Sequence, residues 1–229
     1  MPASDAQNVT IEVAGHGRVS GLLQKPASAR AGYVLAHGAG AGMAHSFMAS
    51  VAKGLAERDI ASLRYQFLYM EQKSKRPDPP KLAQAAVRAA VAEAQRLMPK
   101  LPLFAGGKSF GGRMTSGAQA ADPLAGVSGL VFLGFPLHPA GKPAGERGTH
   151  LSEIRIPMLF LQGTRDALAE LGELEPMVKG LGKRATLKLF DQADHSFHVP
   201  VKSGRKDAEV MSEMLDTIAQ WIDKVITAS

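Results

Sequence analysis

Residues 104–114 read FAGGKSFGGRM, and two motifs overlap within this stretch. Gly107-Lys108-Ser109 matches the end of a phosphate-binding loop. The five residues from Gly107 to Gly111 also match G-x-S-x-G, the pattern of a serine held on a sharp turn between a strand and a helix. The two motifs indicate different classes of protein, so the spacing of the surrounding residues has to distinguish them.

Both nucleotide-binding interpretations fail on spacing. A phosphate-binding loop requires G-x-x-x-x-G-K-[ST], which would place its first glycine at position 102, where the chain has Pro102. A second glycine-rich stretch begins at Gly38, but the dinucleotide pattern G-x-G-x-x-G would need a glycine at Met43. Neither stretch therefore predicts a nucleotide site.

The nucleophile interpretation fits without adjustment. A serine on such a strained turn needs small residues two positions before and two positions after it, and Gly107 and Gly111 occupy those positions. The apolar run 101–105 precedes the turn and the small-residue segment 113–121 follows it, as a strand and a helix should. The pattern predicts that Ser109 is a nucleophile; the alternative is a glycine-rich turn that happens to contain a serine.

Short apolar runs alternate with longer amphipathic segments along the rest of the chain. Strands are expected at 9–13, 19–25, 32–36, 60–65, 101–105, 129–134, 158–162 and 185–190, and helices at 45–58, 82–98, 113–121, 167–181 and 207–226. This alternation predicts an α/β fold, with a mostly parallel central sheet and helices on both faces. The 229 residues contain no repeat and predict a single domain over 1–229. Because 136–154 is short, no large lid domain is expected.

A serine hydroxyl needs a general base, and the base needs an acid that orients it. In a fold of this kind the chain order is serine, then aspartate or glutamate, then histidine. Asp166 follows the strand expected at 158–162, and His195 follows the one at 185–190. The carboxyl ends of parallel strands lie at one edge of the sheet, where such folds form their sites. The sequence therefore predicts a catalytic triad of Ser109, Asp166 and His195.

Other residues nearby could fill the same roles. His198 is the alternative base, although it lies further from the preceding strand and next to a Val-Pro pair. Asp191 and Asp194 are alternative acids, but both are too close to His195 in sequence to approach it from the far side.

An acyl-transfer site also needs hydrogen-bond donors for the oxyanion that develops on the substrate. The backbone N–H of Phe110, directly after the serine, is one expected donor. The second is assigned to the N–H of Ala39 in the loop HGAGAG at 37–42, with Gly40 as the alternative. His37 has no second histidine or carboxylate at metal spacing and is expected to brace this loop.

Composition limits the remaining possibilities. The chain has no cysteine, which excludes disulfides and thiolate nucleophiles, and no cofactor or metal is expected. No membrane span and no secretory signal are recognised, so a cytoplasmic location is expected. The net charge is +6, and the basic residues are mostly scattered singly. They are not interleaved with aromatic residues that could stack on bases, so no nucleic-acid-binding surface is expected. Five basic residues near the motifs nevertheless raise the possibility of an anionic substrate: Lys108, Arg113, Lys142, Arg147 and Arg165.

Over essentially its whole length the sequence resembles the α/β-hydrolase superfamily. More narrowly, it is similar to the dienelactone-hydrolase-like family that includes testis-expressed protein 30 and the hydrolase-like region of the third subunit of the NSL acetyltransferase complex. The resemblance is carried by HGAGAG (37–42), LRYQFLYMEQKSKRPDPP (63–80), GGKSFGGRM (106–114), GFPLHPAGKP (134–143), LQGTRDAL (161–168) and DHSFHVP (194–200).

This resemblance implies a serine hydrolase that cleaves an ester, a thioester or a related acyl bond of a small molecule. The chain departs from dienelactone hydrolases proper, which carry a cysteine nucleophile. Because the narrower family includes a scaffold subunit, a non-catalytic interaction module is the alternative function.

Overall fold

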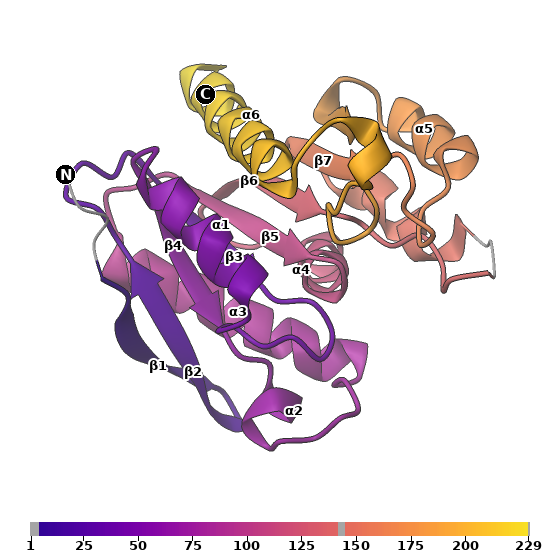
Figure 1. The fold of residues 1–229 in the computed structure, drawn as a ribbon. Helices are drawn as coiled ribbons and strands as arrows, with labels where there is room; N and C mark the ends of the chain where they lie inside the picture. The colour runs from indigo at the N-terminus through magenta and orange to yellow at the C-terminus, as the bar shows by residue number, and fades with distance from the viewer. Residues whose placement is uncertain (1–4, 142–144, 229) are drawn as a thin grey trace.

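One sheet of eight strands runs through the whole molecule (Figure 1). The computed structural model describes residues 5–141 and 145–228. The strands occur in the order β1-β2-β4-β3-β5-β6-β7-β8. Their bounds are β1 Gln7–Val13, β2 Gly17–Gln24, β3 Ala31–Ala36, β4 Ile60–Tyr65, β5 Leu103–Lys108, β6 Val127–Leu133, β7 Met158–Gly163 and β8 Ala185–Phe190. β2 is antiparallel to β1 and to β4, and every other neighbouring pair is parallel.

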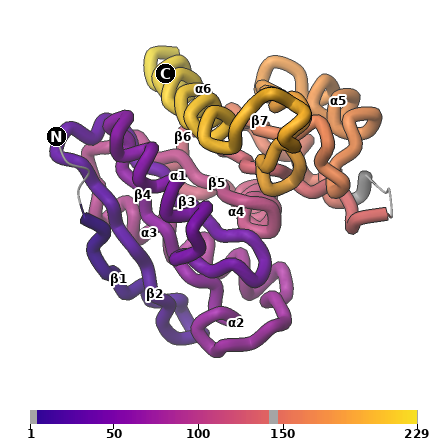
Figure 2. The backbone as a smooth tube through the Cα atoms, viewed as in Figure 1, coloured from indigo at the N-terminus to yellow at the C-terminus, as the bar shows by residue number. Residues whose placement is uncertain are grey.

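The burial of each strand follows its place in the sheet. All six residues of β3, β4 and β7 are buried, which is typical of parallel strands covered on both faces. In β1 and β2, at the edge, exposed and buried residues alternate, because one face of this hairpin meets solvent. The hairpin is the pair of indigo segments labelled β1 and β2 at the lower left of Figure 2.

Helices cover both faces of the sheet. The bounds are α1 Ser46–Ala56, α2 Leu68–Glu71, α3 Pro80–Leu97, α4 Phe110–Ala121, α5 Leu171–Gly180 and α6 Asp207–Ala228, with 3-10 turns η1 Gly145–Glu153, η2 Gly182–Arg184 and η3 Val201–Ser203. α1 and α6 pack into one hydrophobic core with one face of the sheet, and α3, α4 and α5 pack into the other. The predicted fold class, a mostly parallel sheet between two helical layers, is confirmed.

Several element ends differ from the predictions, including the start of α4 at Phe110 and that of α5 at Leu171, and three differences have a clear local cause. β5 runs to Lys108, although glycine at 106 and 107 suggested an earlier end. A Cβ on Gly106 would lie 1.9 Å from the carbonyl oxygen of Val131, and one on Gly107 would lie 2.1 Å from that of Ala36. These glycines therefore let β5 fit between its neighbours.

The other two differences are short turns in segments that were expected to be irregular. The four-residue helix α2 follows β4, and the 3-10 segment η1 lies within the stretch between β6 and β7. Both are too short to produce a recognisable hydrophobic period. No lid subdomain lies between β6 and β7 in the described part of that connection, which excludes 142–144.

Candidate active site

Ser109 lies on a sharp turn between β5 and α4. Its φ of 49° and ψ of −112° are strained for a residue with a side chain. The flanking glycines are required by space, because a Cβ on Gly111 would lie 2.7 Å from atoms of Ala36. A Cβ on Gly112 would likewise lie 2.8 Å from the carbonyl oxygen of Gly107. The turn thus presents the serine side chain at the carboxyl edge of the sheet.

The tertiary structure brings Asp166 and His195 to this serine. His195 Nε2 lies 2.9 Å from Ser109 Oγ, and His195 Nδ1 lies 2.7 Å from Asp166 Oδ2. When Nδ1–H donates to the carboxylate of Asp166, Nε2 carries no proton and its lone pair faces the serine hydroxyl. A general base needs this tautomer of histidine. The three side chains come from the turns after β5, β7 and β8. Along the chain, His195 is 29 residues from Asp166 and 86 residues from Ser109.

Asp166 is buried and accepts several hydrogen bonds. It is only 3% exposed. Its Oδ1 accepts from the backbone N–H of Leu168 at 2.8 Å, and its Oδ2 accepts from Gln162 Nε2 at 2.5 Å as well as from His195. Three donors around one buried carboxylate fix its orientation and that of the imidazole.

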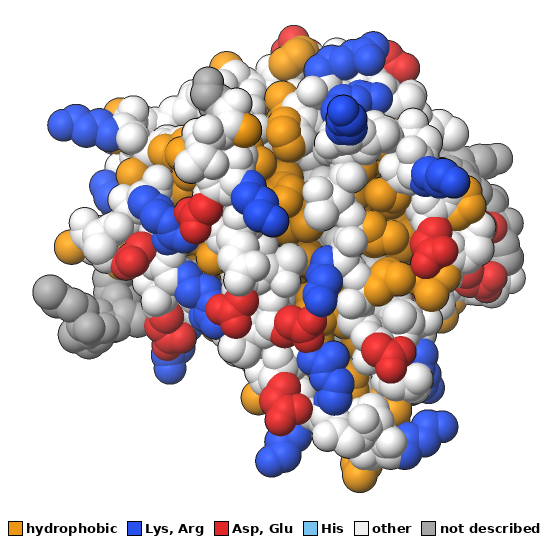
Figure 3. Space-filling view, turned by 90° about the horizontal axis from the view of Figure 1, so that it is seen from above, with side chains coloured by type: hydrophobic (Ala, Val, Ile, Leu, Met, Phe, Trp, Pro, Cys, Tyr) orange, Lys and Arg blue, Asp and Glu red, His pale blue; other side chains and the backbone are white. Residues whose placement is uncertain are grey.

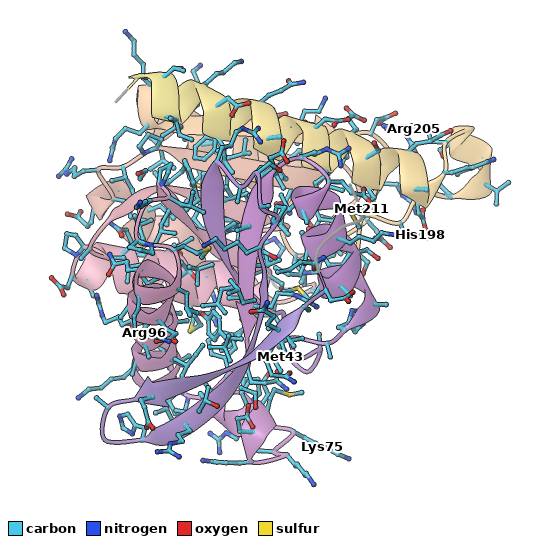
Figure 4. All side chains as sticks on the ribbon, turned by 90° about the vertical axis from the view of Figure 1, so that its left-hand side faces the viewer. Met43, Lys75, Arg96, His198, Arg205 and Met211 are labelled. Carbon is cyan, nitrogen blue, oxygen red and sulfur yellow. The ribbon has the colours of Figure 1, made fainter. Side chains whose placement is uncertain are left out.

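The alternative residues lie elsewhere. His198 is largely exposed near the amino end of α6, where its Nδ1 lies 2.8 Å from Asp207 Oδ2 (Figure 4). The hydrogen bond with Asp207 raises the pKa of His198. Asp194 accepts from the backbone N–H groups of Ser196 and His198, and Asp191 contacts only Thr164. None of these side chains contacts Ser109.

A second serine–histidine pair occurs on the other side of α4. Ser116 Oγ lies 2.8 Å from His150 Nε2. Ser116 is 0% exposed within the helix, and no carboxylate among the described residues pairs with His150. A fully buried serine oxygen cannot reach a substrate, and no described carboxylate supports the imidazole as a base, so this pair is no second nucleophile.

The loop 37–43 follows β3 and lies beside Ser109. Among the described residues, the backbone N–H of Ala39 donates to none and Ala39 lines the cavity beside Ser109. The N–H of Gly40 instead donates to the Tyr69 hydroxyl at 2.8 Å, so this alternative donor is already engaged. Phe110 is the first residue of α4, and its amide has no partner within the helix.

Several side chains brace this loop from behind. His37 Nδ1 lies 2.7 Å from the Gly38 carbonyl, and its Nε2 accepts from the N–H of Phe67. Burial lowers the pKa of His37 to about 4, so the ring is neutral and structural. Arg64 donates to the carbonyl of Met43 at 3.0 Å. Sequence reasoning missed Tyr69, because its contact with the loop depends on α2, which left no periodic pattern.

Replacing Tyr69 by phenylalanine is expected to lower kcat about fivefold with little change in KM. The loss corresponds to about 1 kcal/mol, the usual net value of one hydrogen bond, and arises because the loop carrying Ala39 loses an anchor. Steady-state kinetics on a simple ester checks this. Tyr33→Phe is the matched control: its buried hydroxyl donates to Val131 far along the sheet, so its removal should lower stability and leave kcat unchanged.

Lys108 turns inward and supports the histidine loop. Its Nζ donates to the carbonyl of His195 at 2.5 Å and lies 5.6 Å from the ring centroid of Phe197. Burial lowers the pKa of Lys108 to about 8. Lys108 also lines the cavity beside Ser109, so its contact with His195 adds a positioning role to the suggested attraction for an anionic substrate.

Lys108→Met is expected to lower kcat/KM roughly tenfold to a hundredfold, since the loop loses a charge-assisted hydrogen bond. The native profile should decline modestly above a pH of about 8, where the ammonium loses its charge. The variant should lack that decline, and pH profiles of kcat/KM measure both effects. Lys53→Met, at an exposed position on α1, is the control and should behave like the native protein.

The other basic residues of the suggested cluster separate in space. Arg113 and Arg147 lie together beside α4, on the far side from the histidine loop. Arg165 lies near His198, and Lys142 is outside the described residues. On the face shown in Figure 3, basic and acidic side chains are intermixed. Lys75 belongs to an exposed loop and points away from α6 (Figure 4).

A cavity of about 530 Å³ opens above Ser109 and His195. Phe47, Met48 and Leu168 give it apolar walls, and His198 lies at its rim. This volume suits a small organic molecule. No group of three or more histidine, aspartate or glutamate side chains in 5–141 and 145–228 is arranged to hold a metal ion. Within the same residues, no helix is both long and apolar enough to cross a membrane.

Comparison with known proteins identifies the family. Residues 29–223 match the model of the alpha/beta hydrolase domain family, and the chain belongs to that family. Its fold is similar to a serine hydrolase without a lid from Xanthomonas campestris, with a TM-score of 0.75, 20% identity and 95% of each chain covered.

Two further solved structures have the same fold. A dienelactone hydrolase from Anabaena variabilis gives a TM-score of 0.76 at 19% identity and covers 96% of this chain and 98% of its own. An alpha-beta serine hydrolase homologue from Coxiella burnetii gives 0.74 at 17% identity, with 92% and 96% covered. At such identities the likeness establishes the fold alone.

Proposed function

We propose that this protein is a serine hydrolase that cleaves an ester, thioester or related acyl bond of a small substrate. The observation that carries the proposal is the hydrogen-bonded chain from Ser109 through His195 to Asp166, open to a cavity at the serine. Free amides at Ala39 and Phe110 complete the set of groups that acyl transfer requires.

The chemistry follows from the geometry. Ser109 Oγ attacks the carbonyl carbon while its proton moves to His195 Nε2, and the amides of Ala39 and Phe110 stabilise the oxyanion. The intermediate collapses to an acyl-serine, and the leaving alcohol or thiol takes the proton from Nε2. A water molecule then repeats the sequence: it gives its proton to Nε2, attacks the acyl carbon and releases the acid, and the proton returns to Ser109 Oγ.

The substrate class is inferred from the site and from its neighbours. The cavity of about 530 Å³ accommodates a short acyl group, and no lid is present in the described residues to cover a long chain. Structural neighbours include proteins described as a dienelactone hydrolase and an esterase domain from Rhodothermus marinus.

We further propose a single domain over 1–229, a cytoplasmic location, and kinship with testis-expressed protein 30 and the NSL subunit.

A non-catalytic interaction module remains the second candidate function, and a covalent probe separates the two. A fluorophosphonate phosphonylates a serine, with loss of fluoride, only where a base activates the hydroxyl and an oxyanion site receives the phosphonyl oxygen. We expect one probe per chain, attached to Ser109, as measured by intact-protein and peptide mass spectrometry. Folded native protein that stays unlabelled after prolonged exposure would favour the interaction module.

A further inference from the structure

A second cavity, of about 570 Å³, lies against α4 on the layer opposite α1 and α6. Its lining comes from the amino end of α3, from α4 and from η1, and includes Gln84, Arg113, Arg147, His150 and Glu153. Among the described residues it shares no lining side chain with the cavity at Ser109. It is therefore a separate site.

Two arginines face this cavity without a carboxylate partner. Arg113 and Arg147 both line this one cavity, and burial, followed by the charge of Arg147, lowers the pKa of Arg113. No described carboxylate lies within ion-pair distance of either, whereas Arg58 and Arg205 each pair with an acid. The buried Nε of Arg113 also has no hydrogen-bond partner. Like charges held together in this way repel each other unless an anion lies between them.

The remaining lining groups add donors and little negative charge. His150 is fixed by its 2.8 Å contact with Ser116, and burial and then the charge of Arg113 lower its pKa. The side-chain amide nitrogen of Gln84 lies against Gly117, where a Cβ would approach it to 2.7 Å. Glu153 is the one carboxylate among the described lining residues, so the cavity keeps a net positive charge.

We infer that this second cavity binds a small organic anion, which presents a phosphate or carboxylate group to Arg113 and Arg147. Guanidinium groups bind both anions through paired hydrogen bonds, and the anion would remove the repulsion between the two arginines. The volume exceeds what a single inorganic ion needs and suits a molecule carrying such a group.

The second cavity is adjacent to the helical turn that follows Ser109. Arg113 lies in the first turn of α4, where its backbone N–H donates to the carbonyl of Ser109 at 3.1 Å. Its guanidinium carbon lies 6.0 Å from the ring centroid of Phe110, whose amide is the proposed oxyanion donor. A bound anion would therefore contact the helical turn that begins at the serine. Binding itself does not depend on the proposed hydrolase activity.

Titration of the full chain with inorganic phosphate and, separately, with citrate tests the inference. Both are followed by calorimetry and thermal unfolding, with sodium chloride keeping the ionic strength constant. We expect saturable binding that raises Tm for at least one probe, and the stronger probe distinguishes a phosphate from a carboxylate ligand. Arg147→Gln and Arg113→Gln should each raise the half-saturating concentration by about tenfold or more. Arg155→Gln removes the same charge from an exposed position just after η1 and should bind as the native protein does.

Three results would overturn the inference: no saturable binding of either probe, native affinity in Arg147→Gln, or an equal loss in Arg155→Gln. If Arg113→Gln does not fold, hydrogen exchange on the native protein replaces it. The probe should then protect 113–121 and 147–153, and protection confined to other segments would contradict the assignment. Repeating the titration with Ser109→Ala, which should bind equally well, keeps this outcome separate from that of the hydrolase proposal.

Discussion

Ser109→Ala is expected to lower kcat/KM on a simple ester by about 10⁴–10⁶-fold, the loss that removal of a triad member causes in serine hydrolases. The reason is that, among the described residues, Ser109 supplies the one hydroxyl within hydrogen-bond distance of His195 Nε2. Residual hydrolysis should come only from water activated beside the oxyanion donors. Active-site-titrated kinetics on a short-chain ester measures the effect.

The variant should remain folded, which makes the kinetic result interpretable. Within 5–141 and 145–228, the hydroxyl of Ser109 hydrogen-bonds to His195 alone. Alanine keeps the Cβ of serine, so the positive φ of the turn strains both residues equally. A thermal unfolding midpoint close to that of the native protein is the control. Ester turnover within tenfold of the native value, in a variant with that midpoint, would refute the nucleophile assignment.

Asp166→Asn is expected to lower kcat by about 10⁴-fold, as the corresponding change does in the serine proteases that serve as the general example. The native carboxylate accepts from three donors: Gln162 Nε2, the N–H of Leu168 and His195 Nδ1. An asparagine has one oxygen, so its NH₂ must face at least one of these donors. If it faces His195, the ring adopts the tautomer with the proton on Nε2 and cannot accept from the serine.

The same substitution should also destabilise the fold by about 1–3 kcal/mol, because a buried donor loses its acceptor. Denaturant unfolding measures the loss of stability, and steady-state kinetics measures the loss of kcat. His198→Ala is the companion variant: the ring is exposed and paired with Asp207, so kcat should be retained. Loss of turnover in His198→Ala together with retention in His195→Ala would transfer the role of general base to His198.

The sequence alone determined the features that depend on neighbours along the chain. The alternation of apolar and amphipathic segments predicted the parallel sheet and its two helical layers, because each strand and helix carries its own burial period. The sharp turn that carries Ser109 was recognisable for a similar local reason. A strained serine needs glycine on either side, and the structure shows where those missing Cβ atoms would collide with β3.

Only the tertiary structure could decide which groups meet across long distances in sequence. The spacing left His195 and His198 as alternatives, and the loop after β8 directs one toward Ser109 and the other toward Asp207. Ala39 was likewise the preferred second donor in the sequence, with Gly40 as the alternative. The Tyr69 hydroxyl, held by a helix too short to predict, engages the amide of Gly40 and leaves that of Ala39 free.

The basic residues near Ser109 show most clearly what the sequence predicts and what only the tertiary structure decides. In the sequence, Lys108 and Arg113 flank Ser109 and have the same charge. Strand residues alternate between faces and helix residues rotate by about 100° each, so the fold sends the two side chains in different directions. Lys108 supports the carbonyl of His195, while Arg113 joins Arg147 in the second cavity. Charge can be read from the order of residues, whereas the direction of each side chain depends on the packing of the whole sheet and its helices.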